Sequence, residues 1–219
     1  MIEQQLELVR AELPSHVTLI AVSKTKPLAA LQAAYNAGQR HFGENKVQEM
    51  VEKAQQLPSD IKWHLIGHLQ TNKVKYMAGF VHLIHGVDSL KLLLEIDKQA
   101  AKVGRIQAVL LQFYIAQEDT KFGLDLHEAT ELLNSDTYLS LKNIRICGVM
   151  GMASFTANEA QIREEFKNLV RIFSHLKAAF FQKQHDFKEI SMGMSGDYLL
   201  AVEQGSTMVR VGSKIFGSR

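Results

Sequence analysis

Two kinds of apolar pattern alternate along the chain from end to end. Short stretches rich in β-branched residues are typical of buried strands, whereas stretches with an apolar residue every three or four positions are typical of helices that cover a sheet. The pattern predicts eight strands, at residues 17–24, 40–44, 62–67, 81–88, 105–114, 142–150, 187–192 and 207–212. Every strand except the last is followed by a predicted helix.

The predicted helices carry the residues that helix ends prefer. Pro27 suits the first helical position, and Gly38 suits the C-terminal cap of the same helix. Ser89 and Gly104 delimit a later helix in the same way. The longest helix is expected over residues 158–182, where the apolar residues form one continuous stripe.

Regular alternation of strands and helices implies a parallel sheet. Eight such units favour closure into a (β/α)8 TIM barrel. No linker or shift in composition interrupts the pattern, so we expect one α/β domain over residues 1–219, with an extra amphipathic helix over residues 1–13. An open, doubly wound sheet is the alternative, and the pattern by itself does not exclude it.

Composition narrows the class of protein. Hydrophobic residues make up 46% of the 219 residues, and the net charge of +2 argues against general nucleic-acid binding. Cys147 is the only cysteine, so an internal disulfide is excluded. Because the sequence has neither a signal-peptide pattern nor an apolar run long enough for a bilayer, we expect a cytoplasmic protein with no membrane partner. The near-neutral charge favours a monomer.

The loops after the last two predicted strands are rich in glycine and serine. They read SMGMSGD (191–197) and VGS (211–213). In barrels of this type, phosphate is often bound by these two loops. Glycine allows backbone N–H groups to approach an anion closely, and serine adds hydroxyl donors. One such loop is most simply an ordinary turn, but two at adjacent strand ends favour a phosphate site.

Lys24 ends the first predicted strand. The two-residue period of a strand directs it to the same side as Ile20 and Val22, the inside of the barrel. Apolar surroundings disfavour an ammonium group, and a neutral amine can form a Schiff base with an aldehyde. The simpler alternative is that Lys24 lies on the surface at a strand end. Lys26, two residues further on, is the other candidate for the reactive lysine. Arg210, within the eighth strand, needs either an ion-pair partner or a ligand if it is buried.

The histidines do not predict a metal site. His64 and His68 are four residues apart, and a second pair, His82 and His85, is three apart. Only a helix brings side chains at such spacings onto one face, and His64 lies in a predicted strand. No carboxylate cluster or second cysteine accompanies them. We expect structural or surface roles for these histidines and no bound metal.

Six motifs in order along the chain resemble those of the pyridoxal-phosphate homeostasis proteins, a family that shares the barrel of the alanine racemase N-terminal domain. They are AVSKTKP (21–27), FGEN followed by QE (42–49), WHLIGHLQTNK (63–73), GVMGMAS (148–154), SMGMSGD (191–197) and GSTMVRVGSKIFG (205–217). Together they span almost the whole chain, and as a set they are far more specific than any one of them.

The resemblance implies a protein that binds pyridoxal 5′-phosphate (PLP) and takes part in its intracellular homeostasis. The implied cofactor site consists of Lys24, Asn45, Met194, Ser195, Arg210, Gly212 and Ser213. Lys24 is expected to hold PLP as an aldimine, the loops of SMGMSGD and VRVGS to hold its phosphate, Asn45 to lie near the ring, and Arg210 to face the pyridine nitrogen. Transfer of PLP to PLP-dependent apo-enzymes rests on the resemblance alone.

One segment departs from the family pattern. Tyr114 stands where the family usually has an asparagine-containing segment, although Lys121 and Gly123 are retained. This puts in doubt the ring contacts on that side, not the aldimine.

Two other functions remain open. An amino-acid racemase of low activity is the first, because the racemases tolerate the same arginine. A two-base racemase needs a second acid/base on the opposite ring face. In the racemases this is a tyrosine from a further C-terminal domain, which we expect to be absent here, leaving Tyr114 and Tyr198 as weak candidates. The other function is a cofactor-free barrel enzyme that binds a sugar phosphate.

Overall fold

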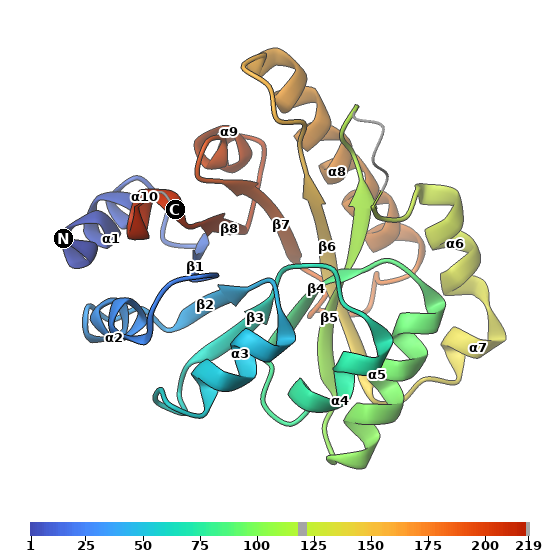
Figure 1. Cartoon of the computed structure of the whole chain (residues 1–219). Coiled ribbons are helices and arrows are strands. Elements are labelled where there is room, and N and C mark those ends of the chain that lie inside the picture. The colour runs from blue at the N-terminus through green and yellow to red at the C-terminus, as the bar shows by residue number, and fades with distance from the viewer. Residues whose placement is uncertain (118–121, 218–219) are drawn as a thin grey trace.

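The computed structural model describes residues 1–117 and 122–217. At its centre is a closed barrel of parallel strands, each paired with the next along the chain, with β8 returning to pair with β1. Helices surround the strands (Figure 1). The strands are β1 (Thr18–Val22), β2 (His41–Glu44), β3 (Lys62–Leu65), β4 (Leu83–Val87), β5 (Gln107–Tyr114), β6 (Ile144–Met152), β7 (Glu189–Met194) and β8 (Met208–Val211).

Most of the helices lie between consecutive strands. They are α1 (Ile2–Ala11), α2 (Leu28–Asn36), α3 (Val47–Ala54), a 3₁₀ turn η1 (Thr71–Lys73), α4 (Val74–Met77), α5 (Leu90–Lys102), α6 (Leu126–Asn134), α7 (Asp136–Leu139), α8 (Glu159–Ala179), α9 (Tyr198–Glu203) and α10 (Ser213–Phe216). Their ends use the expected residues: Ser89 accepts a hydrogen bond from the N–H of Leu92, and Gly38 and Gly104 have positive φ angles.

The structure confirms the barrel and excludes the open sheet, because β1 and β8 are hydrogen-bonded in continuous register. All eight predicted strands are present within a few residues of their predicted limits. The prediction that no helix follows the last strand is wrong, since α10 follows β8. A single turn of helix is too short to produce an apolar period, which also explains why α7 was not predicted.

Alternate residues of the strands face opposite sides, as the two-residue period requires. An inner apolar layer fills the barrel and consists of Ile20, Leu83, Leu110, Cys147, Met150 and Met208. Two residues further along four of these strands stand Val22, Gln112, Met152 and Arg210, all of which line a pocket. The inner layer is therefore the floor of that pocket.

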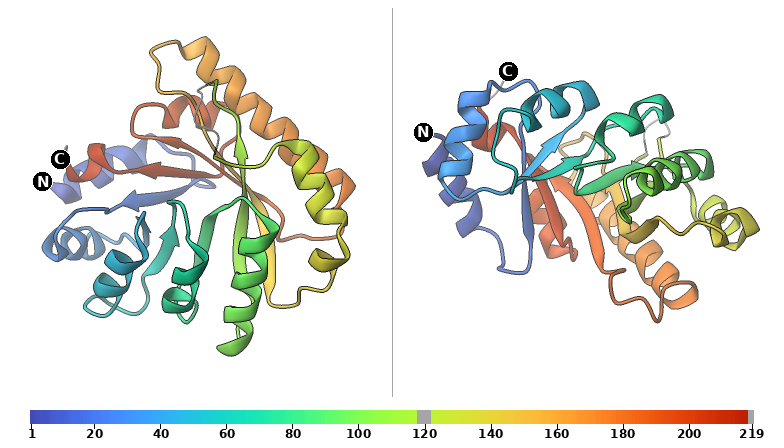
Figure 2. Two further views of the ribbon diagram at one scale, coloured as in Figure 1. Left: turned by 45° about the vertical axis from the view of Figure 1, so that its right-hand side comes forward. Right: turned by 90° about the horizontal axis from the view of Figure 1, so that it is seen from below.

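The amino-terminal helix α1 packs against α2 and α10. Figures 1 and 2 show the amino terminus beside the carboxyl-terminal helix in each view. Arg10 fixes α1 to the barrel by donating hydrogen bonds to Ala37 O (2.8 Å) and Gln39 Oε1 (2.9 Å). Among the described residues, no helix combines the length and the apolar character that crossing a membrane would require.

Candidate functional site

A pocket of about 730 Å³ opens at the carboxyl ends of the strands, a volume within the usual range for small-molecule sites. All seven residues predicted as cofactor-binding line it: Lys24, Asn45, Met194, Ser195, Arg210, Gly212 and Ser213. Other residues in its lining were not singled out from the sequence, namely Ile66, Gln112, Phe122, Phe155 and Gly217. They are apolar or small, or lie in the middle of a strand, so nothing in their type distinguishes them from core residues.

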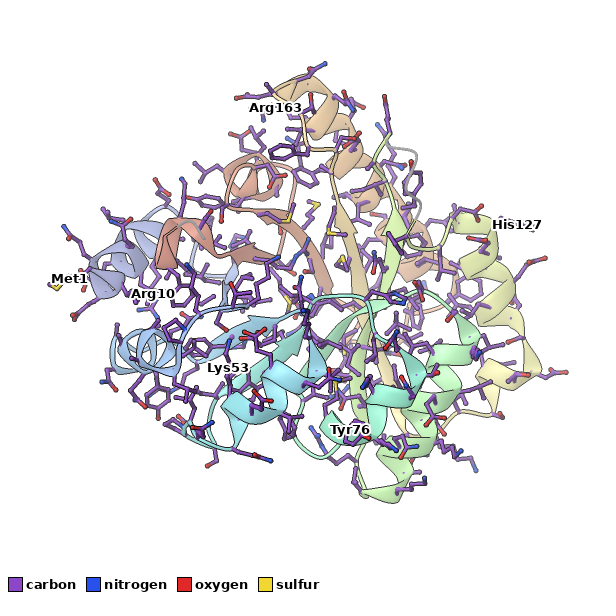
Figure 3. All side chains as sticks on the ribbon, viewed as in Figure 1. Met1, Arg10, Lys53, Tyr76, His127 and Arg163 are labelled. Atoms are coloured by element: carbon purple, nitrogen blue, oxygen red, sulfur yellow. The ribbon has the colours of Figure 1, made fainter. Side chains whose placement is uncertain are left out.

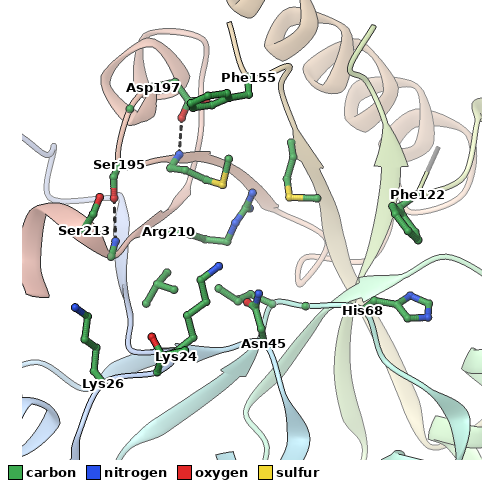
Figure 4. Close-up of a pocket in the computed structure, with 18 of the residues that line it drawn as sticks. Lys24, Lys26, Asn45, His68, Phe122, Phe155, Ser195, Asp197, Arg210 and Ser213 are labelled. Carbon is green, nitrogen blue, oxygen red and sulfur yellow. Dashed lines mark hydrogen bonds between the residues drawn. The ribbon is translucent and has the colours of Figure 1, made fainter. Parts of the chain in front are cut away.

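Lys24 and Lys26 both line the pocket but differ in their partners. The side chain of Lys24 extends into the middle of the pocket, toward Arg210 (Figure 4). Within the described part of the chain, no hydrogen bond or ion pair engages its Nζ. The Nζ of Lys26 instead donates to the carbonyls of Phe216 (3.1 Å) and Gly217 (3.0 Å), after α10. The structure therefore assigns Lys26 to holding the carboxyl-terminal helix and leaves the amine of Lys24 available.

The turn that presents Lys24 has an unusual backbone. Thr25 has a φ of 64°, a conformation that a β-branched residue rarely adopts. Its N–H donates to Oε1 of Glu49 (2.6 Å), and the N–H of Lys26 donates to the carbonyl of Ser23 (3.0 Å). Local strain of this kind persists only where surrounding contacts impose it. These contacts hold the turn, and with it the base of the Lys24 side chain.

A buried ion pair lies beneath this turn. Lys53 of α3, labelled in Figure 3, donates from Nζ to Glu44 Oε1 (2.8 Å), to Glu49 Oε1 (2.7 Å) and to the carbonyl of Ser23 (2.8 Å). The hydroxyl of Ser23 donates to the same Glu44 oxygen (2.6 Å). Burial raises the pKa of the Glu44 carboxyl above its ordinary value, although Lys53 and Ser23 act to lower it. No pattern in the sequence predicts that these residues pair.

Asn45 directly follows β2, where the next strand's loop approaches it closely. A Cβ added to Gly67 would lie 2.6 Å from the carbonyl oxygen of Asn45. Only glycine therefore allows the loop after β3 to pack here. This contact positions the backbone of Asn45 at the pocket wall.

The two glycine-serine loops are joined to each other. The N–H of Gly212 donates to Oγ of Ser195 (3.0 Å), so the loops after β7 and β8 form one wall of the pocket (Figure 4). In the first loop the N–H of Met194 donates to Oδ1 of Asp197 (2.5 Å), and burial raises the pKa of that carboxyl. The helices that follow the loops are short, so backbone N–H and hydroxyl groups, rather than a long helix dipole, would be the main anion donors.

Arg210 is 4% exposed, and its guanidinium faces the pocket. Its Nη1 donates to Ser191 Oγ (2.6 Å) and its Nη2 to the carbonyl of Gly151 (3.1 Å). Burial lowers the pKa of Arg210 to about 10, and the nearby Asp197 acts in the opposite direction. The guanidinium is therefore charged at neutral pH. Its hydrogen-bond partners are neutral, so the structural ion pair, the simpler alternative from the sequence, is absent among the described residues.

A row of histidines continues from Arg210 across the barrel interior. Ser191 Oγ lies 2.9 Å from His85 Nδ1, His85 Nε2 lies 2.9 Å from His64 Nδ1, and His64 Nε2 lies 2.9 Å from His41 Nδ1. His64 and His85 are fully buried, and burial lowers the pKa of each well below its ordinary value. These imidazoles are neutral at neutral pH, and the row holds Ser191 against Arg210.

The two tyrosines named as weak second bases do not line the pocket. Tyr198 is buried, and its hydroxyl donates to Glu12 and accepts from Lys214. Tyr114 ends β5, and Gln112 of the same strand lines the pocket in its stead. Lys121, part of the retained motif, lies outside the described residues.

Over residues 1–219 the chain matches the family described as alanine racemase, N-terminal domain. The pyridoxal phosphate homeostasis protein of Aquifex aeolicus (strain VF5) is 38% identical over 204 residues, covering 92% of this chain and 86% of that protein. The protein of the same name from Escherichia coli (strain K12) is 36% identical over 211 residues, covering 94% of this chain and 87% of that protein.

Solved structures agree with this match. PipY of Synechococcus elongatus PCC7942 without PLP has a TM-score of 0.91 and 37% identity, covering 99% of this chain and 100% of PipY. PipY with PLP bound has a TM-score of 0.86 and 36% identity, with the same coverage. The alanine racemase of Bartonella henselae (TM-score 0.75, 17% identity, 58% of its length covered) shares only the fold. The chain therefore belongs to the pyridoxal phosphate homeostasis protein family.

Proposed function

We propose that this protein binds PLP in the pocket at the carboxyl ends of its strands, attached to Lys24 as an aldimine, and serves PLP homeostasis in the cytoplasm. One observation carries the proposal. A single pocket brings together an amine that no other described residue engages, two linked glycine-serine loops and a buried guanidinium. These match the aldehyde, the phosphate and the ring nitrogen of PLP.

Each group has a distinct part in binding. When bound, PLP supplies an aldehyde that condenses with an amine with loss of water. Among the described residues nothing bonds the Nζ of Lys24, whereas Lys26 bonds the carbonyls of Phe216 and Gly217, so Lys24 is the proposed attachment point. Ser195, Gly212 and Ser213 offer hydroxyl and backbone N–H donors to the phosphate, Met194 lies beside them, and Asn45 borders the ring.

Arg210 favours a carrier over a catalyst. A guanidinium donates a hydrogen bond to the pyridine nitrogen and, as a permanent cation, discourages protonation there. An unprotonated ring withdraws electrons less strongly, so carbanion chemistry at a bound amino acid is less favourable. The protein would then hold PLP, limit the free aldehyde and release it to PLP-dependent apo-enzymes. The name of the family supports the role in homeostasis. The release of PLP to apo-enzymes and the lack of catalysis are part of what we propose.

Absorption spectroscopy of the purified chain tests the attachment. Wild type with added PLP should show an aldimine band in the near-ultraviolet or visible range, and borohydride should fix PLP to Lys24. Lys24→Ala should lack the band. Lys26→Ala should keep it, because the hydrogen bonds of Lys26 serve the carboxyl-terminal helix.

Circular dichroism of each variant separates loss of binding from loss of fold. A band that survives in Lys24→Ala but disappears in folded Lys26→Ala would move the attachment to the rival lysine. If wild type showed no band even with excess PLP, the leading proposal would fail, and the cofactor-free phosphate-binding barrel would replace it.

A further inference from the structure

Three histidines meet at the amino-terminal end of the barrel, the end opposite the pocket. His41 begins β2, His64 lies in β3, and His82 immediately precedes β4. One ring nitrogen of each lies within 4.8 Å of those of the other two, and His41 Nδ1 is 2.9 Å from His64 Nε2. Their spacing along the chain suggested no such cluster, because they lie at the beginnings of three adjacent strands or just before them and meet only through strand pairing.

We propose that His41, His64 and His82 form a binding site for one divalent transition metal ion of the Zn²⁺ type. Tetrahedral zinc with Zn–N distances of about 2.0–2.1 Å places its ligand nitrogens roughly 3.3 Å apart. The 2.9 Å between His41 Nδ1 and His64 Nε2 is slightly shorter than this spacing. The distances from these two rings to the His82 nitrogen are at most 4.8 Å, so they can exceed it. His82 is exposed, so its side chain can rotate to close the remaining gap. The fourth position is left to water.

The hydrogen bonds of the cluster can accommodate a metal ion. His41 Nδ1 and His64 Nε2 share one proton in the metal-free protein. A metal ion needs a lone pair from both nitrogens, so on binding this proton would move to Nε2 of His41.

Further partners orient the buried ligand. Ligating histidines almost always donate their other ring N–H to a fixed acceptor. The Nδ1 of His64 lies 2.9 Å from Nε2 of His85, and Nδ1 of His85 lies 2.9 Å from Ser191 Oγ. With metal on Nε2 of His64, the proton of this ring lies on Nδ1 and is donated to His85 Nε2, and His85 in turn donates from Nδ1 to Ser191 Oγ. These contacts set the tautomers of His64 and His85. The ring of His64 is thereby fixed in the orientation that the site requires.

The surrounding charges restrict which metal can bind. Lys62 and Arg105 are close enough to lower the pKa of His82, so they also oppose a cation at the cluster. No described carboxylate belongs to the cluster. Mg²⁺ and Ca²⁺ prefer oxygen ligands, whereas Zn²⁺, Cu²⁺ and Ni²⁺ bind imidazole strongly. Only metals of the second group could overcome the repulsion.

Calorimetric titration of the full chain with ZnCl₂ tests the site. The protein should carry no polyhistidine tag and should first be freed of metal with a chelator. Wild type should bind one equivalent of Zn²⁺ with micromolar or tighter affinity and should not bind Mg²⁺. His82→Ala removes one ligand at the surface and should weaken binding by at least about tenfold, the lower end of what changes around metal sites produce. Lys62→Gln should tighten it, because a repelling charge is removed.

Two exposed histidines with carboxylate partners serve as matched controls. His127, labelled in Figure 3, pairs with Glu131 on α6, and His68 lies near Asp88 at the pocket. His127→Ala and His68→Ala should each bind Zn²⁺ as wild type does. The proposal is overturned if wild type binds no stoichiometric Zn²⁺, if folded His82→Ala binds it as tightly as wild type, or if either control variant abolishes binding.

Discussion

At the scale of single residues, the pocket is defined by which polar groups already have partners. Lys24 and Lys26 are two positions apart and both reach the pocket, yet only Lys26 donates to protein carbonyls. Ser195 differs again, because its Oγ accepts the N–H of Gly212 and so joins the two loops proposed to hold phosphate. The loss of that hydroxyl should therefore affect phosphate binding without touching the attachment at Lys24.

We expect Ser195→Ala to bind PLP more weakly but still to form the aldimine at saturating PLP. A hydrogen bond to a charged group contributes roughly 1.5–3 kcal/mol, which corresponds to about a tenfold to hundredfold rise in Kd. Titration followed by absorbance measures the Kd. Ser174→Ala, on the exposed face of α8, is the matched control and should match wild type. Pyridoxal, which lacks the phosphate, should bind Ser195→Ala and wild type equally; an equal weakening for both ligands would refute the phosphate role.

At the scale of elements, the sequence predicted what a local period determines. The order of eight strands follows from their apolar runs, and the inward direction of Lys24 follows from the alternation that also buries Ile20. Contacts between elements could not be predicted. The pairing of Glu44 with Lys53 requires α3 to pack over the turn after β1, and a buried ion pair has no sequence period. The histidine row is likewise a product of strand pairing.

We expect Lys53→Met to destabilise the fold by about 3–5 kcal/mol, because removing one partner leaves the other charge buried and unpaired. Guanidinium denaturation measures the change. Glu44→Gln combined with Lys53→Met should recover much of the loss, since the fully buried charge of Glu44 is then removed too, and Glu49, the other partner of Lys53, is 23% exposed. If Lys53→Met were as stable as wild type, the ion pair would have no part in holding the turn beneath Lys24.

The loss in free energy of unfolding that Lys53→Met causes should also depend on pH. Burial already raises the pKa of Glu44, and loss of the lysine raises it further. A carboxyl with a raised folded-state pKa contributes stability that is fully present below its unfolded pKa and is lost as pH rises through the folded pKa. The deficit relative to wild type should therefore be largest at neutral pH and shrink on acidification. A deficit that stays constant across that range would assign it to lost packing rather than to the Glu44 charge.

At the scale of the whole molecule, the barrel has two chemically different ends. The carboxyl ends of the strands surround a pocket with an amine, a guanidinium and loops rich in N–H donors. The amino-terminal ends bring together His41, His64 and His82. The apolar layer around Ile20 lies between them, and the row from His64 to Ser191 crosses it through hydrogen bonds. Substrate chemistry at the pocket must therefore come from the residues of the carboxyl end.

This restricts what the protein can do to a bound amino acid. Two-base racemisation needs an acid/base on each face of the cofactor ring. Lys24 can serve one face, but neither Tyr114 nor Tyr198 lines the pocket, and the Tyr198 hydroxyl is already bonded to Glu12 and Lys214. We expect PLP-loaded wild type to form D-alanine from L-alanine no faster than Lys24→Ala with free PLP, measured by chiral chromatography. Turnover that is clear in wild type and lost in Lys24→Ala would contradict this expectation. His68, which does line the pocket, would then be the first residue to replace, because it could supply the missing base.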